Sequence, residues 1–243
     1  MREVLSDILK QTATLYECIK VTVDGGSTTL EATDKEATIF LQAELKQQVP
    51  ELVGQFGMNN LAMLAGLLAF PSYNTDDAKF TIGRAQYGGK DVVTQFKFED
   101  GKGGFSDYRL IMPNMIPDQA EIRSIPWNLT FEPNKSRLAE FQQLAALYSK
   151  AGGAQFAPKT VGGDLHFFIG EEDSADHSAS MMFEPEVDTI LGGEIKFPTQ
   201  TFLAALKLAG TNPVNISLST VGVLKVSIDT QHGNYNYLIR GSR

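Results

Sequence analysis

The sequence of 243 residues contains almost no cysteine, and Cys18 is the only one. One cysteine cannot form a disulfide within the chain, and it excludes any zinc site with two or more cysteine ligands. Proteins that do not depend on disulfides are typical of reducing compartments, so a cytoplasmic location is predicted.

Long apolar runs are also missing. The longest nearly uncharged apolar stretch covers residues 61–70, which falls well short of the roughly 20 residues that span a bilayer. The first residues, MREVLSDILKQ, lack the unbroken apolar segment of a signal peptide. No membrane association is therefore predicted.

Motifs for catalysis and metal binding are absent as well. The three histidines, His166, His177 and His232, include no pair at metal-ligand spacing. His177 follows an acidic run that could bind a cation weakly, although a solvated loop is the favoured interpretation. The glycine run at 101–104 does not match the G-x-x-x-x-G-K-[ST] pattern that a phosphate-binding loop has before a helix, and the predicted strands on either side of it indicate a hairpin. We predict no catalytic residues, no metal and no cofactor, and the chain is not expected to be an enzyme.

Positive charge is in the minority, since 21 basic residues face 29 acidic ones and the net charge is −8. This balance argues against nucleic-acid binding, because phosphate neutralisation needs Lys and Arg. A partner nevertheless responds to local fields and not to the sum. The positions of the basic residues therefore matter more than their number.

What the sequence does contain is one order of elements that occurs twice. Each half is predicted to have an amphipathic helix, strands, a short apolar helix and further strands. The predicted helices cover residues 3–17, 58–70, 134–150 and 198–209. The stretch between the halves has three prolines and little periodicity, which indicates an extended linker. The predicted division is a first domain at 1–112, a connector at 113–126 and a second domain at 127–243.

Short matches support the repeat. Leu15-Tyr16 and Leu147-Tyr148 end the first helix of each half, and Phe56 and Phe197 precede the second helices. Such matches are weak alone, so the shared order of elements carries the inference. The alternative is two unrelated α+β domains.

Three stretches resemble the sliding clamps of DNA replication: FGMNNLAMLAGLLAF with KFTIGR after it, FSDYRLIMP, and FLAALKLAG with VNISLSTVGVLKVSIDTQHGNYNYLIRG. The likeness is greatest to the polymerase accessory clamp of tailed bacteriophages, and more distant to proliferating cell nuclear antigen. It implies an α+β clamp fold, in which two similar domains each pack two helices on antiparallel sheets and the helices line a ring. The implied function is a processivity factor that encircles duplex DNA without reading its sequence.

The resemblance also implies partners and surfaces. The partners would be the DNA polymerase, a clamp-loader ATPase and further copies of the chain, in a homotrimer. The residues that would face DNA are Lys10, Asn59, Lys135, Arg137, Lys150 and Lys207. The alternative is that these side chains belong to ordinary solvated helix faces.

The resemblance further implies a groove for partner peptides, bordered by the connector and the C-terminal strands, and the apolar residues of the connector agree with it, because such residues on an extended segment need something to contact. Its predicted residues are Met112, Met115, Ile116, Val223, Tyr237 and Ile239. In the alternative interpretation these side chains pack on their own domains, and this is preferred for Ile122.

The subunit seam is assigned, by the same resemblance, to two strand edges, since unpaired edges favour pairing with another chain. One edge is residues 105–110 and the other is residues 178–183. The predicted interface residues are Phe105, Tyr108, Leu110, Met181 and Phe183. For Tyr108, a plain core aromatic is the alternative.

Two other functions stay open from the sequence. A monomeric processivity factor would hold DNA by charge, against which the net charge of −8 speaks. A non-replicative phage scaffold or assembly protein would have capsid or tail partners. An unrecognised hydrolase is more distant than either.

Overall fold

The computed structural model describes residues 1–117, 124–149, 154–170 and 177–243. The chain divides into two compact units. Unit 1 comprises residues 1–35, 40–121 and 230–235, and unit 2 comprises residues 36–39, 122–229 and 236–243.

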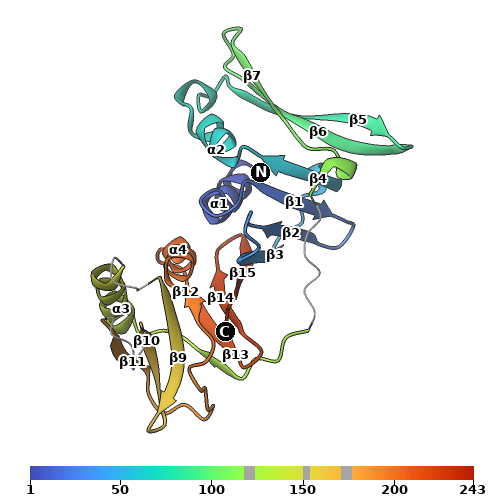
Figure 1. The fold of residues 1–243 in the computed structure, drawn as a ribbon. Coiled ribbons are helices and arrows are strands. Elements are labelled where there is room, and N and C mark those ends of the chain that lie inside the picture. The colour runs from blue at the N-terminus through green and yellow to red at the C-terminus, as the bar shows by residue number, and fades with distance from the viewer. Residues whose placement is uncertain (118–123, 150–153, 171–176) are drawn as a thin grey trace. The chain divides into compact units, whose positions relative to one another are not determined.

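Unit 1 contains an antiparallel sheet in the order β4-β1-β2-β3 (Figure 1). Buried and more exposed residues alternate along β1 and β2, as expected of strands with one face on a core. The tight turn predicted between them is present, and Asp24 Oδ1 accepts hydrogen bonds from the Gly26 and Ser27 amides at 3.0 and 2.8 Å. The strands are β1 (Cys18–Val23), β2 (Thr28–Thr33), β3 (Ile39–Leu45) and β4 (Gly54–Asn59).

A second sheet of unit 1 has the order β5-β6-β7. Its strands are β5 (Lys79–Tyr87), β6 (Lys90–Glu99) and β7 (Phe105–Arg109). The rings of Phe96 and Phe98 on β6 and of Tyr108 on β7 are buried, and Phe96 lies nearly parallel to Tyr108 with ring centroids 6.1 Å apart. Within the described residues β7 pairs only with β6, so its other edge is open.

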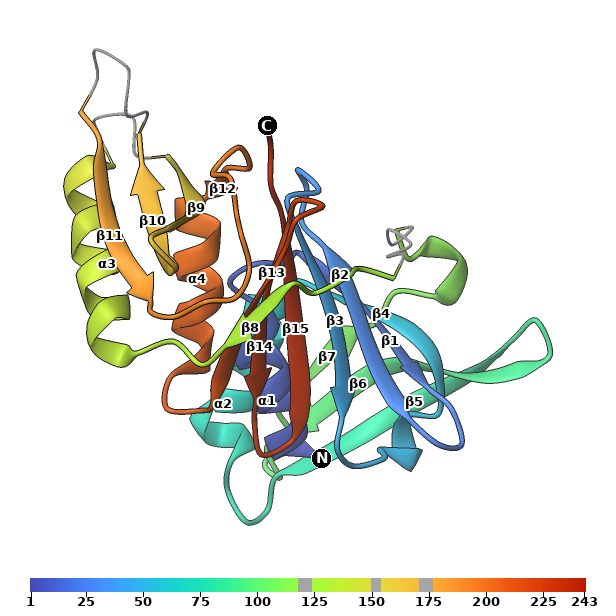
Figure 2. The same ribbon diagram turned by 90° about the horizontal axis from the view of Figure 1, so that it is seen from below.

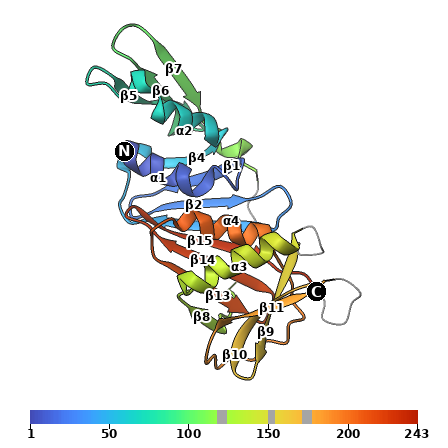
Figure 3. The ribbon, with the colours of Figure 1, turned by 90° about the vertical axis from the view of Figure 1, so that its left-hand side faces the viewer.

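Two helices, α1 (Arg2–Thr12) and α2 (Leu61–Ala69), pack against each other in unit 1 (Figure 3). Helix α1 ends before the predicted residue 17, and the Thr12 hydroxyl donates back to the Ile8 carbonyl at 2.7 Å in its last turn. Helix α2 begins after the predicted residue 58, because Met58 pairs with Ile19 in the sheet. Strand β4 was not predicted, because its Gly-rich residues show no strand alternation.

Unit 2 repeats this plan. Strands in the order β15-β14-β13-β8 form one sheet, and the order β11-β10-β9-β12 forms another (Figure 2). The first group is β8 (Leu129–Phe131), β13 (Val214–Ser219), β14 (Val223–Asp229) and β15 (Gly233–Arg240), whose second half belongs to this unit. The second is β9 (Gln155–Val161), β10 (Asp164–Ile169), β11 (Ala179–Glu184) and β12 (Phe197–Pro198).

The helices of unit 2 are α3 (Lys135–Tyr148) and α4 (Thr199–Ala209). They lie side by side, with the Phe141 and Phe202 ring centroids 6.0 Å apart (Figure 3). The Asn134 side chain caps α3 by accepting from the Ser136 amide at 2.9 Å. Buried phenylalanines from both helices and from all the strands of the second sheet form a continuous aromatic core in this unit: Phe141, Phe156, Phe167, Phe183, Phe197 and Phe202.

The predicted fold class is confirmed. Each unit joins two α-helices to antiparallel strands, which makes the chain an α+β protein with a repeated plan. Over the residues described, no helix has both the length and the apolar character needed to cross a membrane.

Candidate nucleic-acid and partner interfaces

Three of the six residues predicted to face DNA present exposed charges on helices. Lys10 lies in the last turn of α1, Lys135 opens α3, and Lys207 lies in the last turn of α4. All three side chains are exposed, because the apolar residues of each helix turn toward the sheets. Among the described residues none of them forms an ion pair, so each amine can interact with solvent or a ligand.

Arg137 is placed differently from these lysines. Its Nη1 atom donates to the Phe183 carbonyl at 3.3 Å and lies 3.9 Å from the Glu184 carboxylate. Both partners belong to β11, so the guanidinium ties α3 to that strand. Its charge is partly neutralised by Glu184, which weakens the case for DNA contact.

The remaining two predicted DNA residues are Asn59 and Lys150. Asn59 ends β4 and is half-buried. Its carbonyl accepts a hydrogen bond from the Tyr108 hydroxyl, and this bond uses the Asn59 backbone and not its side chain. Lys150 lies outside the described residues.

Helix α2 exposes an apolar face without any charge. Met63 and Phe70 are each 50% exposed. Ala62, Gly66 and Ala69 share the exposed surface of this helix. The sequence correctly indicated a neutral second helix. The structure shows that apolar atoms, and not the two asparagines alone, form its surface.

Acidic side chains offset part of the positive charge on the helices. Glu3 on α1 and Glu140 on α3 are exposed. Asp7 is occupied within unit 1, since its Oδ2 atom accepts from the Thr230 hydroxyl at 2.8 Å and the Tyr235 hydroxyl at 2.9 Å. Acidic and basic side chains are therefore mixed on the helix faces, and the described residues form no strongly basic patch there.

The start of the connector carries three of the residues predicted for the partner groove. Met112 and Ile116 are half-buried, and Met115 in the short 3₁₀ turn Pro113–Met115 is 70% exposed. Backbone hydrogen bonds of 2.9 and 2.8 Å between Gly57 and Ile111 fix this segment to β4. A Cβ atom at Gly57 would lie 3.2 Å from Ile116, so Ile116 packs on its own unit. Met115 is the accessible apolar side chain here.

The other three groove residues belong to unit 2, and two of them are in its core. Tyr237 and Ile239 are both fully buried. Successive residues of a strand point to opposite faces, so their neighbours Asn236 and Arg240 face the other way and are more exposed. The side chains of Tyr237 and Ile239 are not available to a partner. The prediction that these two residues line a partner groove is therefore wrong. Val223 is half-buried, and its part in partner binding stays a prediction.

The polar face of the β15-β14-β13 strands includes residues that the sequence did not single out. The Lys225 amine lies 4.5 Å from the ring centroid of Trp127, the only tryptophan, and partial burial lowers the pKa of Lys225. Leu238 also belongs to this face, although only 4% of it is exposed. The strand alternation around Asn234, Asn236 and Arg240 contains the signal that would have identified this face.

The first predicted seam edge, on β7, has one exposed aromatic residue. Phe105 is 64% exposed, with the Lys97 amine 5.6 Å from its ring centroid. Tyr108 is a core residue, as its alternative interpretation held, and burial raises its pKa. Leu110 is also buried. In the described part of the chain, the buried Oδ1 atom of Asp107 has no hydrogen-bond partner.

The second predicted edge is β11, which pairs only with β10 among the described strands. Met181 is half-buried at this edge. Phe183 is fully buried and stacks on Phe167 with ring centroids 4.0 Å apart. Phe183, like Tyr108 and Leu110, can therefore contribute to a seam only through its backbone, which corrects the prediction for these three side chains.

A metal centre finds no support in the described ranges, where no three His, Cys, Asp or Glu side chains gather in a way that could hold an ion. Comparison of the sequence with protein-family models and with curated proteins gives no match.

Solved structures, in contrast, match along the whole chain. PCNA from Thermococcus kodakaraensis covers 100% of this chain and 97% of its own, with a TM-score of 0.66 and 12% identity. PCNA of A. fulgidus, in a structure with the C-terminal region of FEN-1 bound, gives a TM-score of 0.64 and 13% identity, with coverage of 100% and 96%. Proliferating Cellular Nuclear Antigen from Entamoeba histolytica gives 0.65 and 11%, again with coverage of 100% and 96%. The chain shares the PCNA fold.

Proposed function

We propose that this protein is a sliding clamp, a processivity factor that closes into a homotrimeric ring around duplex DNA and tethers the replicative polymerase. The observation that carries the proposal is the PCNA fold over the entire chain. The proposed role involves no bond-making chemistry, and a separate clamp-loader ATPase would open the ring. We further propose a clamp of the tailed-phage type acting in the host cytoplasm, with domains at 1–112 and 127–243 joined by the connector 113–126.

Ring closure would use the two open strand edges, one in each unit. Strand β7 and strand β11 each pair on one side only among the described residues. An antiparallel pair formed between β7 of one subunit and β11 of the next would satisfy their free backbone groups. Each subunit would then offer one edge of each kind, which allows a closed ring.

Contact with DNA would be weak and independent of sequence. Lys10, Lys135 and Lys207 can attract phosphates, while α2 adds a neutral face. Retention of a closed ring is topological, so tight phosphate contacts are unnecessary and would slow sliding. A net charge of −8 is compatible with such a role, because the negative charge elsewhere discourages binding outside the ring.

Partner peptides would bind at the start of the connector, where Met112, Met115 and Ile116 keep accessible surface. Binding of the C-terminal region of FEN-1 to the A. fulgidus protein supports peptide capture as a use of this fold. Methionine suits a site with several clients, because its side chain adapts to different shapes.

Mass measurement in solution together with retention on circular DNA tests the proposal. The expected results are a particle of three subunits and, after loading at a nick, protein that stays on circular DNA at high salt and leaves when the circle is cut. A monomer that dissociates from circles and linear DNA alike as salt rises would indicate a charge-held processivity factor instead. Monomer without any DNA retention would overturn both.

A further inference from the structure

Strand β5 of unit 1 has an open edge at the place where unit 2 has an additional strand. The two units repeat one hairpin, since β5 and β6 follow α2 in unit 1 and β13 and β14 follow α4 in unit 2 (Figure 1). Among the described residues β13 pairs with β14 on one side and with β8 on the other, whereas β5 pairs only with β6. Backbone groups that β8 satisfies in unit 2 therefore have no strand partner in unit 1.

The sequence and register of the two hairpins match closely. Residues 80–82 of β5 (Phe-Thr-Ile) and residues 216–218 of β13 (Ile-Ser-Leu) share the order apolar, hydroxyl, apolar. The middle residue of each run lies opposite a lysine of the next strand, Lys97 in β6 and Lys225 in β14. The open edge of β5 is therefore equivalent to the edge of β13 that β8 covers.

Strand β8 shows which kind of segment this edge accepts. It consists of Leu129–Phe131 and runs antiparallel to β13. The Phe131 ring contacts the buried Phe183 ring, with centroids 6.0 Å apart. The Thr130 hydroxyl, on the opposite face of the strand, donates to the Ser217 hydroxyl at 2.9 Å. A segment with two apolar residues around one hydroxyl residue thus covers the core and pairs with the sheet.

The apolar residues of β5 are less covered than their counterparts in β13. Ile216 and Leu218 are 0% and 1% exposed. Phe80 also faces the core of its unit, where its ring lies 5.1 Å from that of Phe98, and Ile82 shares its face of the strand. Both Phe80 and Ile82 are nevertheless only half-buried. An added strand of the β8 type would bury the apolar surface that they expose.

The edge is long enough and accessible. A bulge between Gly83 and Arg84 interrupts the regular pairing of β5, so residues 79–83 form its first regular stretch, which is longer than the three residues of β8. Thr81, at the centre of this stretch, is exposed. A ring closed through β7 would use the opposite edge of the same sheet and would leave β5 open.

We propose that the open edge of β5 binds an extended segment of a partner protein, which adds to the sheet as an antiparallel strand with the order apolar, hydroxyl, apolar. Backbone hydrogen bonds would supply much of the affinity, and the two apolar side chains beside Phe80 and Ile82 would supply the selectivity. The site is separate from the connector groove. It is complete within unit 1 of one subunit, so the proposal can be tested whether or not the chain assembles.

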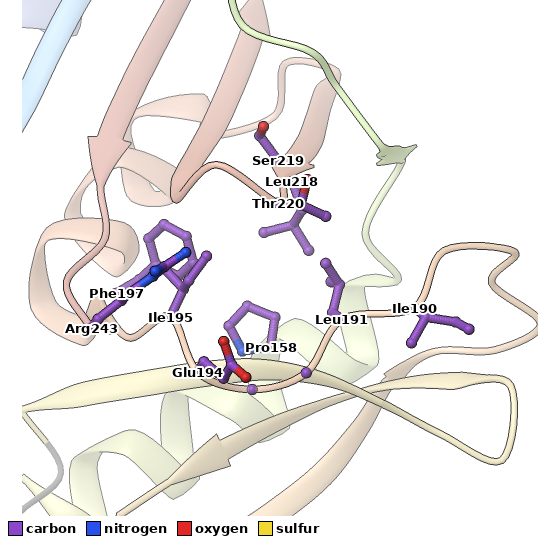
Figure 4. Close-up of a pocket in the computed structure, with 12 residues that line it drawn as sticks. Pro158, Ile190, Leu191, Glu194, Ile195, Phe197, Leu218, Ser219, Thr220 and Arg243 are labelled. Carbon is purple, nitrogen blue, oxygen red and sulfur yellow. The ribbon is translucent and has the colours of Figure 1, made fainter.

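Methyl-group NMR on the full chain provides the test, with a capped synthetic peptide of residues 125–133 as the probe, because it contains β8. The expected result is a saturable shift of the Ile82 methyl signal, while Ile216 stays unchanged under its own β8. Ile190 borders an apolar pocket in unit 2, is 85% exposed, and reports binding to any apolar surface (Figure 4). Shifts of Ile216 or Ile190 without a shift of Ile82 would overturn the proposal. A shift of Ile82 on protein dilution without peptide would do the same, by indicating a second copy as the occupant.

Two control peptides separate the backbone contribution from that of the side chains. One is N-methylated at residues 128–131, which keeps the side chains but removes the backbone donors. The other replaces Leu129 and Phe131 by aspartate, which keeps the backbone but removes the apolar side chains. Each is expected to bind at least about tenfold more weakly than the unmodified peptide. Equal binding of the three peptides would refute strand addition.

A variant with the additional strand built into unit 1 completes the test. Insertion of residues 128–134 between Met1 and Arg2 places a copy of β8 before α1, as β8 precedes α3 in unit 2. The start of α1 lies beside β5, because the Arg2 guanidinium is 5.9 Å from the Phe80 ring centroid. This variant is expected to melt at least about 2 °C higher and to lose the response to the peptide, since its own strand occupies the edge.

The matched control for this variant carries the same insertion with aspartate at both apolar positions, and it should melt and bind the peptide like wild type. If the two insertions bind the peptide equally well, the β5 edge is not the binding site.

Discussion

The hydroxyl group of Tyr108 on β7 donates a hydrogen bond to the carbonyl oxygen of Asn59 at the end of β4. Tyr108 is 1% exposed. The residue after Asn59, Asn60, has a left-handed backbone with φ of 48° and leads directly into α2. One buried side chain thus connects the proposed seam strand to the start of a proposed DNA-facing helix within unit 1.

Replacing Tyr108 by phenylalanine is expected to lower the free energy of unfolding by about 1 kcal/mol. The Asn59 carbonyl would be deprived of a buried partner while the ring packing on Phe96 stays. Urea unfolding followed by circular dichroism measures the change. Tyr148→Phe is the matched control, because its hydroxyl donates to Ser178 at 3.2 Å in an exposed position and its removal should cost less. Equal destabilisation in the two variants would contradict a special role for the Tyr108 bond.

The same tyrosine should give the protein a measurable alkaline sensitivity. Burial, aided by the nearby Cys18, raises the pKa of Tyr108 above its ordinary value of 10.0. The folded state then binds this proton more tightly than the unfolded state, so the stabilisation is complete below about pH 10 and declines as the pH rises above it. We expect the stability difference between wild type and Tyr108→Phe to shrink progressively as the pH rises above about 10. A constant difference would show that this hydroxyl does not titrate with unfolding.

The fold was predictable where periodicity is strong, and the sites were predictable only to the level of a strand or helix. Helices α3 and α4 begin within one residue of their predicted starts, because Asn134 caps one and Pro198 precedes the other. Strand β4 and the short β12 carry no such signal. The alternation within a strand such as Tyr235–Ile239 does not indicate which of its two faces is buried. For this reason Tyr237 was assigned to a groove, although it lies in the core.

The seam proposal predicts that an exposed ring on β7 matters for assembly and not for folding. Phe105→Asp places a charge at the open edge, where Phe105 is 64% exposed. We expect sedimentation to show a larger monomer fraction at micromolar concentration, while the melting temperature stays within a few degrees of wild type. Phe70→Asp is the matched control, since Phe70 is half-exposed beside α2. If both variants assemble alike, β7 does not form the seam at this residue.

The charged helix positions should act on DNA affinity in a graded and salt-dependent way. Reversal of Lys10, Lys135 or Lys207 to glutamate is expected to weaken binding to short duplexes at low salt. It should also reduce the slope of log affinity against log salt by about one for each phosphate that the protein no longer neutralises. Lys102→Glu, in the exposed loop between β6 and β7, serves as the control. Met63→Lys on the neutral face of α2 should act in the opposite direction and strengthen binding, and if it does not, α2 does not face DNA.

Met115 offers the sharpest test of the partner groove, because it is the most exposed apolar residue at the start of the connector. Met115→Ala is expected to reduce polymerase stimulation at limiting clamp concentration by about fivefold or more, in keeping with removal of an interface anchor. The subunit mass and retention on circular DNA should be unchanged, because this exposed side chain contributes little to the packing of its own unit.

The control for this prediction is Leu147→Ala, at a comparably exposed apolar position on α3, which should leave polymerase stimulation intact. A Met115→Ala clamp that stimulates the polymerase like wild type would place the tether elsewhere on the molecule.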